Sequence, residues 1–314
     1  MPFAADTWAL ILGGSSGFGL ATAHKLSRHG MNVCLVHRDR RGAMPRIERE
    51  FDAIRGSGVR LLTFNADALD AAERGRIGTE LASTLGASGR VRVLLHSIAL
   101  GNLKLMAPER PPRDGDACAR LAGALGIDAA ALAATVDRLF AEGAEALHTI
   151  ASPPAYPASA LLDEEDMART VYSMGTSLLS WTQELLQRNL LAADARVFGL
   201  TSEGNQIAWK GYAAVAAAKV ALESIVRAMA VELAPYGVRA NVIQAGVTDT
   251  PALRLIPGSA HLKAHARLRN PFRRLTAPED VANVIYLLAH DEAAWINGEI
   301  IRVDGGEHIS GVMR

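Results

Sequence analysis

Two polar residues, Tyr212 and Lys219, lie seven positions apart in an alanine-rich stretch that is otherwise suited to a buried helix. From Tyr212 onward the stretch has no glycine or proline for more than three turns, and its apolar residues recur at intervals of three and four, which predicts a helix. Seven residues at about 100° each bring both side chains to one face, about two turns (~10 Å) apart. A phenol near an ammonium is expected to have a lowered pKa and to be a better acid toward a developing oxyanion. The pair therefore predicts acid catalysis, although a snorkelling lysine and a packed tyrosine can share this spacing.

A glycine-rich turn follows the first apolar run of the chain. Residues 8–12 predict a strand and residues 20–29 a helix, and the turn between them contains Gly13, Ser15, Ser16, Gly17, Phe18 and Gly19. Strand, glycine-rich turn and helix in this order form the context of a dinucleotide-binding turn, where the backbone approaches a pyrophosphate at the helix N-terminus. Glycines in such a turn can also serve packing alone, so it is the position after a strand that favours nucleotide binding.

Further apolar runs predict a parallel sheet with helices on both faces. The expected strands cover residues 32–37, 59–64, 91–96, 196–200, 238–244 and 298–303, and the expected helices include 71–85, 163–190 and 278–290. No internal repeat or linker divides the chain. These units predict a single α/β domain, a doubly wound parallel sheet of Rossmann type with about seven strands.

The carboxyl ends of strands line the ligand crevice of such a sheet. Residues at these ends are Arg38, Asp67, Ala68, Ser97, Ile98 and Ala99. An arginine after the second strand favours a ribose 2′-phosphate, and hence NADP over NAD, unless Arg38 is part of a solvated turn balanced by Asp39. Asp67 is expected near the adenine, although it could instead cap the next helix. Residues 97–99 are expected beside the ribose.

Residues 104–160 interrupt the alternation of strands and helices. Prolines stand at both borders, and the segment between them has two alanine- and leucine-rich helical stretches, 118–126 and 128–148, which indicates an insertion. Because the insertion follows the end of a strand, we expect it on the ligand side of the sheet. It could be a lid over the substrate or an oligomer contact.

Composition limits the class of protein. The chain has 314 residues, 49% hydrophobic side chains and a formal net charge of zero, so it can bury a large core and has no basic excess for nucleic acid or an anionic membrane. The start lacks a basic leader, its apolar run is short, and the two cysteines have no metal-ligand spacing, which favours a cytoplasmic protein. His261 and His265 are four positions apart but lack the carboxylate of an HExxH motif, so no metal site is expected.

With these motifs in place, the chain resembles the short-chain dehydrogenase/reductase family over nearly its whole length, apart from the insertion. Most members place the lysine four residues after the tyrosine, whereas the spacing of seven in this chain is similar to that of the enoyl-acyl-carrier-protein reductase branch. The run HSIA at 96–99 and the closing run at 270–306, which begins NPFRRLTAPED, are also similar to that branch.

The resemblance implies roles for individual residues. Tyr212 would stabilise and protonate an enolate, and Lys219 would hold the nicotinamide ribose hydroxyls. The segment of Gly246, Val247 and Thr248 matches the one that holds the nicotinamide amide. Ser202, ten residues before Tyr212, would be an oxyanion donor or only a capping serine. Residues 252–270 match the substrate-binding loop and are expected to be mobile.

These roles imply an oxidoreductase that reduces the C2–C3 double bond of an α,β-unsaturated acyl thioester with NADPH, or alternatively with NADH. The acyl group could be presented on an acyl carrier protein, on coenzyme A or free, and the family suggests a homotetramer in fatty acid biosynthesis. A carbonyl reductase or alcohol dehydrogenase on the same scaffold is the alternative enzyme. A non-catalytic nucleotide-sensing protein is the alternative from another class.

Overall fold

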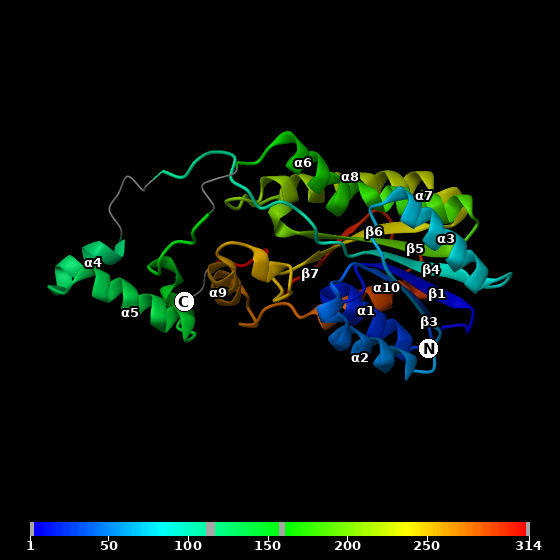
Figure 1. Cartoon of the computed structure of the whole chain (residues 1–314), viewed down its shortest axis with the longest axis horizontal. Coiled ribbons are helices and arrows are strands. Elements are labelled where there is room, and N and C mark those ends of the chain that lie inside the picture. Colours follow the sequence, from blue (N-terminus) through cyan, green and yellow to red (C-terminus); the bar gives the residue numbers. More distant parts are fainter. Residues whose placement is uncertain (1–2, 111–116, 157–160, 312–314) are drawn as a thin grey trace.

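The computed structural model describes residues 3–110, 117–156 and 161–311 of the chain. Within these residues, seven parallel strands form one sheet in the order β3-β2-β1-β4-β5-β6-β7 (Figure 1). In chain order the strands are β1 (Thr7–Leu12), β2 (Asn32–His37), β3 (Leu61–Asn65), β4 (Arg90–His96), β5 (Leu191–Ser202), β6 (Arg239–Ala245) and β7 (Ile300–Val303). The expected single Rossmann-type domain is confirmed. The strand order reverses direction after β1, and such a switch point is where ligands bind in open α/β sheets.

Side chains alternate between the two faces of the sheet because successive residues of a strand point in opposite directions. In β1, Leu10 and Leu12 belong to one core cluster and Ala9 and Ile11 to the other. Helices α3 (Ala71–Leu85), α7 (Ser177–Gln187) and α8 (Ala213–Glu232) cover the first face, and α1 (Gly17–Arg28), α2 (Met44–Arg55) and α10 (Pro278–Leu288) cover the second. Both faces of the sheet are therefore shielded from solvent, which is why the strand sequences are continuous apolar runs.

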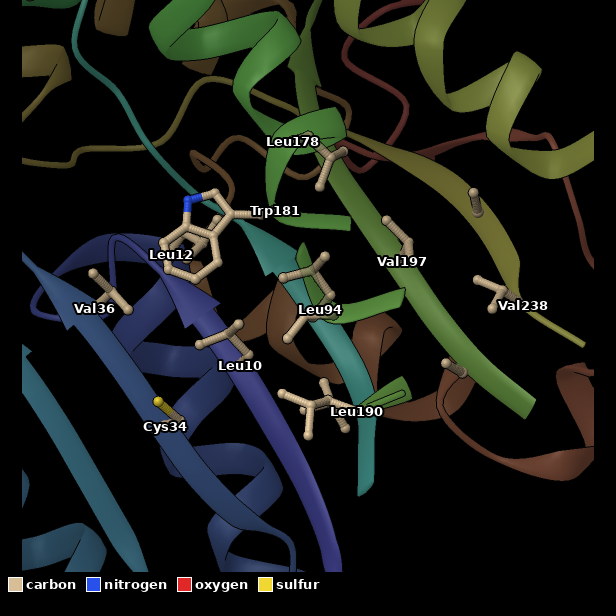
Figure 2. Close-up of a cluster of buried hydrophobic side chains, with 14 of the residues drawn as sticks. Leu10, Leu12, Cys34, Val36, Leu94, Leu178, Trp181, Leu190, Val197 and Val238 are labelled. Carbon is tan, nitrogen blue, oxygen red and sulfur yellow. The ribbon is translucent and has the colours of Figure 1, made fainter. Parts of the chain in front are cut away.

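The core under α7 also holds one loop of the ligand crevice. Leu178 and Trp181 of α7 lie over side chains of β1, β2, β4 and β5 (Figure 2). The indole Nε1 of Trp181 donates a hydrogen bond of 2.8 Å to the carbonyl oxygen of Ala68, in the turn after β3. Packing of α7 on the sheet thus fixes the backbone next to Asp67.

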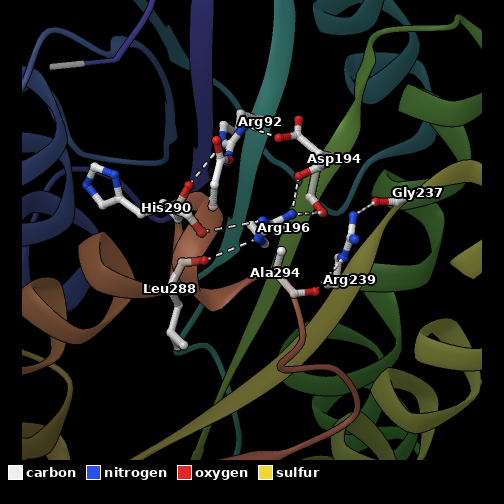
Figure 3. A network of polar contacts seen from close by, with 11 residues as sticks. Arg92, Asp194, Arg196, Gly237, Arg239, Leu288, His290 and Ala294 are labelled. Carbon is white, nitrogen blue, oxygen red and sulfur yellow. Dashed lines mark hydrogen bonds and ion pairs between the residues drawn. The ribbon is translucent and has the colours of Figure 1, made fainter. Parts of the chain in front are cut away.

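Three arginines on neighbouring strands fasten the opposite, amino-terminal edge of the sheet (Figure 3). Arg92 of β4 pairs with Asp194 and Asp291, and the fully buried Arg196 of β5 donates to backbone carbonyls at the end of α10. Arg239 of β6 donates to the carbonyl oxygen of a residue after α10, at 2.9 Å. These contacts tie the end of α10 and the residues that follow it to three strands, at the edge opposite the carboxyl ends of the strands.

Several predicted elements differ in their bounds. The strand expected at 59–64 is β3, and the one expected at 196–200 extends over all of β5. The helix expected at 163–190 is α6 (Glu164–Val171), a π turn (Tyr172–Thr176) and α7. Gly175 in the π turn lies against α8, where a Cβ would be 2.7 Å from the carbonyl oxygen of Ala218. Helix α2 was missed, although its buried Ile47, Phe51 and Ile54 have helical spacing.

The segment 252–270, which we expected to be a mobile loop, is largely helical. It contains a 3-10 turn η6 (Leu253–Leu255) and helix α9 (Ser259–Arg269). The buried face of α9 consists of Ala264, Ala266 and the polar Arg269, so the sequence carries no apolar stripe that would predict a helix.

The insertion forms helices α4 (Ala117–Leu125) and α5 (Ala129–Ala141) and a 3-10 turn η2 (Glu145–Thr149). Helices α4 and α5 extend away from the sheet, and η2 returns to pack against α9 (Figure 1). Two parts of the expected insertion, 111–116 and 157–160, lie outside the described residues. Among the residues described, no single helix is long and apolar enough to span a membrane; α4 and α5 pass that test only as a pair bent by 118°.

Candidate active site

A cavity of about 750 Å³ lies at the carboxyl ends of the strands. Almost every candidate residue chosen from the sequence lines it: Gly13, Ser15, Ser16, Gly17, Phe18, Arg38, Asp67, Ala68, Ser97, Ile98, Ala99, Ser202, Tyr212, Lys219, Gly246, Val247 and Thr248. Six strand ends contribute to this set. The parallel sheet therefore brings together residues that are distant in the sequence.

The glycines of the turn between β1 and α1 serve two purposes. Gly13 and Gly17 have φ angles of 86° and 53°, in the left-handed region that favours glycine. A Cβ on Gly13 would lie 2.4 Å from the carbonyl oxygen of Ser97, so the turn reaches the end of β4 only without a side chain. Gly19 does not line the cavity; it lets α1 pass close to Gly13, whose carbonyl oxygen would lie 2.2 Å from a Cβ.

The N-terminus of α1 offers backbone donors to this cavity. Ser16 is the N-cap residue, but its side chain makes no capping hydrogen bond, and the first turn has no acidic residue. The first N–H groups of a helix lack intrahelical acceptors and lie at the positive end of its dipole, so they attract anions. The turn therefore fits the pyrophosphate of a dinucleotide.

Arg38 and Asp67 form an ion pair at the ends of β2 and β3, with Nη1 and Oδ2 2.8 Å apart. Their side chains are 51% and 39% exposed, so either charge could turn toward a ligand. Asp67 does not cap α3, because the N-cap of that helix is Asp70. The alternative that Asp39 balances Arg38 is also wrong, since Asp39 bonds to Nδ1 of His37 at 2.9 Å.

The sequence predicted that Tyr212 is the first residue of this helix. In the structure α8 begins at Ala213, and Tyr212 is its N-cap residue. Its hydroxyl lies 3.5 Å from Oγ of Ser202 at the end of β5. Burial raises the pKa of Tyr212, and the Ser202 hydroxyl offsets this only in part. The expectation of a pKa lowered by Lys219 is therefore wrong: loss of hydration outweighs the favourable contacts. The phenol stays protonated near neutral pH, which suits a proton donor.

Lys219 is buried in α8 and borders the same cavity. Its Nζ donates to the carbonyl oxygen of Leu200 at 2.9 Å. Burial lowers the pKa of Lys219 to about 8, against the opposing effect of the Glu223 carboxylate. An ammonium has three donors, so donors remain for a ligand in the cavity.

Comparison with known proteins identifies the family. Residues 127–308, more than half of the chain, match the family described as enoyl-(acyl carrier protein) reductase. The chain belongs to this family. The family is of the short-chain dehydrogenase/reductase type, and membership of it implies a nicotinamide dinucleotide cofactor.

Individual relatives agree with this assignment. FabI of Aquifex aeolicus, named as an NADH-dependent enoyl-acyl-carrier-protein reductase, is 37% identical over 136 residues, which cover 43% of this chain and 50% of FabI. The chain thus spans about half the length of this relative. A cis-4-hydroxycyclohexanecarboxylate dehydrogenase of Sinomonas cyclohexanicum is 30% identical over 57% of this chain and 72% of its own length.

Solved structures share the fold. The NADH-dependent enoyl-acyl-carrier-protein reductase of Aquifex aeolicus superposes with a TM-score of 0.69 at 23% identity, over 98% of each chain. A short-chain dehydrogenase/reductase mutant of Serratia marcescens superposes with a TM-score of 0.70 at 19% identity, over 98% of this chain and 99% of the other. At these identities the structures support the fold alone.

In this reductase-family chain, Glu223 is a site residue that sequence reasoning missed. It lies on α8 one turn after Lys219 and is buried. Its Oε1 accepts hydrogen bonds from Oγ1 of Thr201 at 2.5 Å and from Nδ2 of Asn205 at 2.6 Å. These partners flank Ser202, so Glu223 sets the position of the Ser202 loop relative to α8. The sequence did contain a signal for it, because Lys219 and Glu223 are four positions apart and so lie on the same face of a predicted buried helix.

A second missed cluster holds α9 in place. Arg269, the last residue of α9, lies 2.5 Å from Oε2 of Glu203 and 3.3 Å from Oε1 of Glu307. All three side chains are largely buried. Glu203 also lines the cavity directly after Ser202. Because the three residues are far apart in the sequence, no local pattern could have found them.

Proposed function

We propose that the protein reduces the C2–C3 double bond of an α,β-unsaturated acyl thioester, with NADPH as the preferred cofactor. The observation that carries this proposal is the placement of Tyr212, Ser202 and Lys219 around one cavity, with the spacing of seven between tyrosine and lysine. Membership of the enoyl reductase family supports it.

Tyr212 would donate a proton as charge develops on the thioester oxygen. Burial keeps its hydroxyl protonated, and Ser202, 3.5 Å away, would add a second hydrogen bond to the same oxygen. The bound nicotinamide would supply the hydride that reduces the β-carbon. Charge then builds several bonds from that carbon, so the acid must stand further from the nicotinamide than in ketone reduction. The spacing of seven between Tyr212 and Lys219 is compatible with that distance.

The cofactor would lie along the strand ends. Residues 13–18 would hold the pyrophosphate, Asp67 and Ala68 the adenine, and residues 97–99 and Lys219 the nicotinamide ribose. Gly246, Val247 and Thr248 would hold the nicotinamide amide. Arg38 would bind the 2′-phosphate of NADPH once its contact with Asp67 opens. NADH is the alternative, since FabI relatives carry NADH in their names.

The carrier of the acyl group would be an acyl carrier protein, as the family description suggests, in fatty acid biosynthesis and in a homotetrameric enzyme. Coenzyme A is the alternative carrier. One relative is named 1-cyclohexenylcarbonyl-CoA reductase, at 35% identity over 42% of its length.

A second candidate is an alcohol dehydrogenase or carbonyl reductase. The dehydrogenase of Sinomonas cyclohexanicum favours it, because the match covers 72% of that relative. The deciding experiment follows consumption of NADPH and NADH with a trans-2-enoyl thioester and with a β-ketoacyl thioester. Consumption with the enoyl substrate is expected. Consumption with only the keto substrate would establish the second candidate, and cofactor binding without any turnover would indicate a nucleotide sensor.

A further inference from the structure

The insertion contributes to the wall of the cavity. His148 of η2 and two residues of the returning segment, Pro154 and Tyr156, line the cavity together with Trp209, His261 and His265. An ion pair between Glu145 of η2 and Arg267 of α9 holds the insertion against this wall. We call residues 150–156 the strap.

The strap is fixed at both sides of the cavity by contacts that need glycine. On one side, the Tyr156 hydroxyl donates to the carbonyl oxygen of Lys210 at 3.2 Å, and a Cβ on Gly211 would lie 3.0 Å from the Tyr156 ring. On the other side, a Cβ on Gly258 would lie 2.7 Å from Pro154. Gly211 directly precedes Tyr212, so the strap borders the space where the acyl group would extend from the proposed acid.

Imidazole rings gather in this part of the cavity. The rings of His148 and His265 have centroids 5.9 Å apart, and those of Trp209 and His265 lie 6.1 Å apart. Nδ1 of His148 is 3.1 Å from the carbonyl oxygen of Glu145. Since a carbonyl only accepts, Nδ1 of His148 donates this bond, which leaves Nε2 as the nitrogen that can accept when the imidazole is neutral. Nε2 of His261 is buried without a hydrogen-bond partner.

The rings of α9 are held neutral. Burial lowers the pKa of His261, and the nearby His148 lowers it further. Burial likewise lowers the pKa of His265, with Arg269 and His148 acting in the same direction. Among the described residues, no group of three or more histidine, cysteine or acidic side chains could hold a metal ion. A carboxylate gains little from neutral rings, and a hydrocarbon leaves the buried nitrogen of His261 unpaired.

We propose that His148, His261 and His265, together with Trp209 and the strap, form a compartment that binds a hydroxyl group on the acyl chain beyond the reacting double bond. A hydroxyl can donate to Nε2 of His148, and to the buried Nε2 of His261 once that ring turns toward the cavity, which a plain hydrocarbon chain cannot do. The preferred substrate is therefore a hydroxylated enoyl thioester. The preference in turnover rests on the proposed function, because it needs an enoyl thioester to be reduced. The binding of a hydroxylated acyl chain does not depend on that reaction.

The test compares trans-2-enoyl N-acetylcysteamine thioesters in matched pairs, with and without a hydroxyl on the last acyl carbon, over a series of chain lengths. At the best length, kcat/KM of the wild-type enzyme should favour the hydroxylated substrate by about tenfold. The double variant His148→Phe, His261→Phe should lose this preference, measured as the ratio of kcat/KM for the two substrates within the same variant. His261→Gln, which keeps a polar group, should retain part of it, and His24→Phe, outside the cavity, should retain all of it.

A binding measurement keeps the two proposals separable. Titration calorimetry with the saturated hydroxyacyl and acyl thioesters, in the presence of NADP⁺, needs no turnover. Tighter binding of the hydroxyacyl thioester to the wild type, lost in the double variant, supports the compartment even if no enoyl thioester is reduced. Equal binding of both thioesters to the folded wild-type enzyme, or a preference that survives in the double variant, overturns it. Thermal unfolding of each variant establishes that it is folded.

Discussion

The Nζ atom of Lys219 donates to the carbonyl oxygen of Leu200 across 2.9 Å and so joins the second turn of α8 to the end of β5. Tyr212 and Ser202 stand at the ends of these same two elements. The lysine therefore holds together the two walls that carry the proposed acid and its hydrogen-bonding partner, while its remaining donors would serve the cofactor.

The first prediction concerns the pH dependence that follows from Lys219. Its pKa lies at about 8, so the ammonium is charged below that pH and neutral above it. We expect kcat/KM to fall as the pH rises through about 8, since a donor and a charge are lost. In Lys219→Met the fall should be absent and KM for the cofactor should already be high. The same decline in both proteins would assign it to another group.

The same ionisation has an opposite consequence for stability. The folded-state pKa is below the ordinary value of 10.5, so between about 8 and 10.5 the unfolded chain binds more protons and the folded state gains stability as pH rises. Below that window the cost of burying the charge is at its largest. Lys219→Met should therefore unfold at a higher temperature than the wild type at neutral pH, by a margin that shrinks toward alkaline pH.

The second prediction concerns Tyr212 and Ser202. Tyr212→Phe removes the proposed proton donor and should lower kcat by about 10²–10⁴-fold. Its Kd for the cofactor should not change, because the hydroxyl bonds to Ser202 and is assigned no contact with the cofactor. Ser202→Ala should cost roughly tenfold, as expected for one hydrogen bond. Single-turnover rates measure these effects. Normal turnover by Tyr212→Phe would exclude the phenol as the acid.

The third prediction concerns the Arg38–Asp67 ion pair. Arg38→Ala should weaken NADPH binding by roughly tenfold, because a charged hydrogen bond to the 2′-phosphate is lost, and should affect NADH far less. Asp67→Asn should strengthen the binding of NADPH relative to that of NADH. It removes the carboxylate that lies 2.8 Å from Arg38, so the guanidinium is free to bind the 2′-phosphate. Cofactor titrations by fluorescence give the six dissociation constants of the wild type and the two variants. If Arg38→Ala weakens the binding of NADPH and of NADH equally, the arginine does not contact the 2′-phosphate.

The sequence predicted the parts of the molecule that local patterns encode. Apolar strands, the turn at Gly13 and the Tyr212–Lys219 spacing depend on neighbouring residues, and the cavity at the strand ends follows from the sheet topology. Contacts between distant segments, such as Arg269 with Glu307, leave no local signal. The raised pKa of Tyr212 was missed because it depends on how completely the fold removes water from the phenol. The expected position of the insertion on the ligand side of the sheet is confirmed, but its contact with the residues next to Tyr212 became visible only in three dimensions.

The fourth prediction concerns Arg269. Its guanidinium lies between Glu203 and Glu307, and burial raises the pKa of Glu307. Arg269→Met leaves two buried carboxylates without their cation, which should destabilise the protein by about 3–5 kcal/mol. Arg269→Lys keeps the positive charge and should destabilise the protein less. Urea denaturation provides these values. A loss below about 1 kcal/mol for Arg269→Met would mean that water reaches the carboxylates.

The fifth prediction separates charge from geometry at Glu223. The Oε1 of a glutamine in this place can still accept from Thr201 and Asn205, so Glu223→Gln should keep the loop of Ser202 in position. The carboxylate raises the pKa of Lys219, so its removal should lower that pKa below about 8. The decline of kcat/KM should then begin at a lower pH, with an unchanged rate on its acidic side.

Glu223→Ala is the matched variant, because it removes the acceptor as well as the charge. It should show the same shift in pH and, in addition, a lower kcat, since Thr201 and Asn205 lose their common partner and Ser202 is no longer held near Tyr212. An identical pH profile for wild type and Glu223→Gln would mean that the charge of Glu223 is not felt at Lys219. The carboxylate would then act on the site through hydrogen bonding alone.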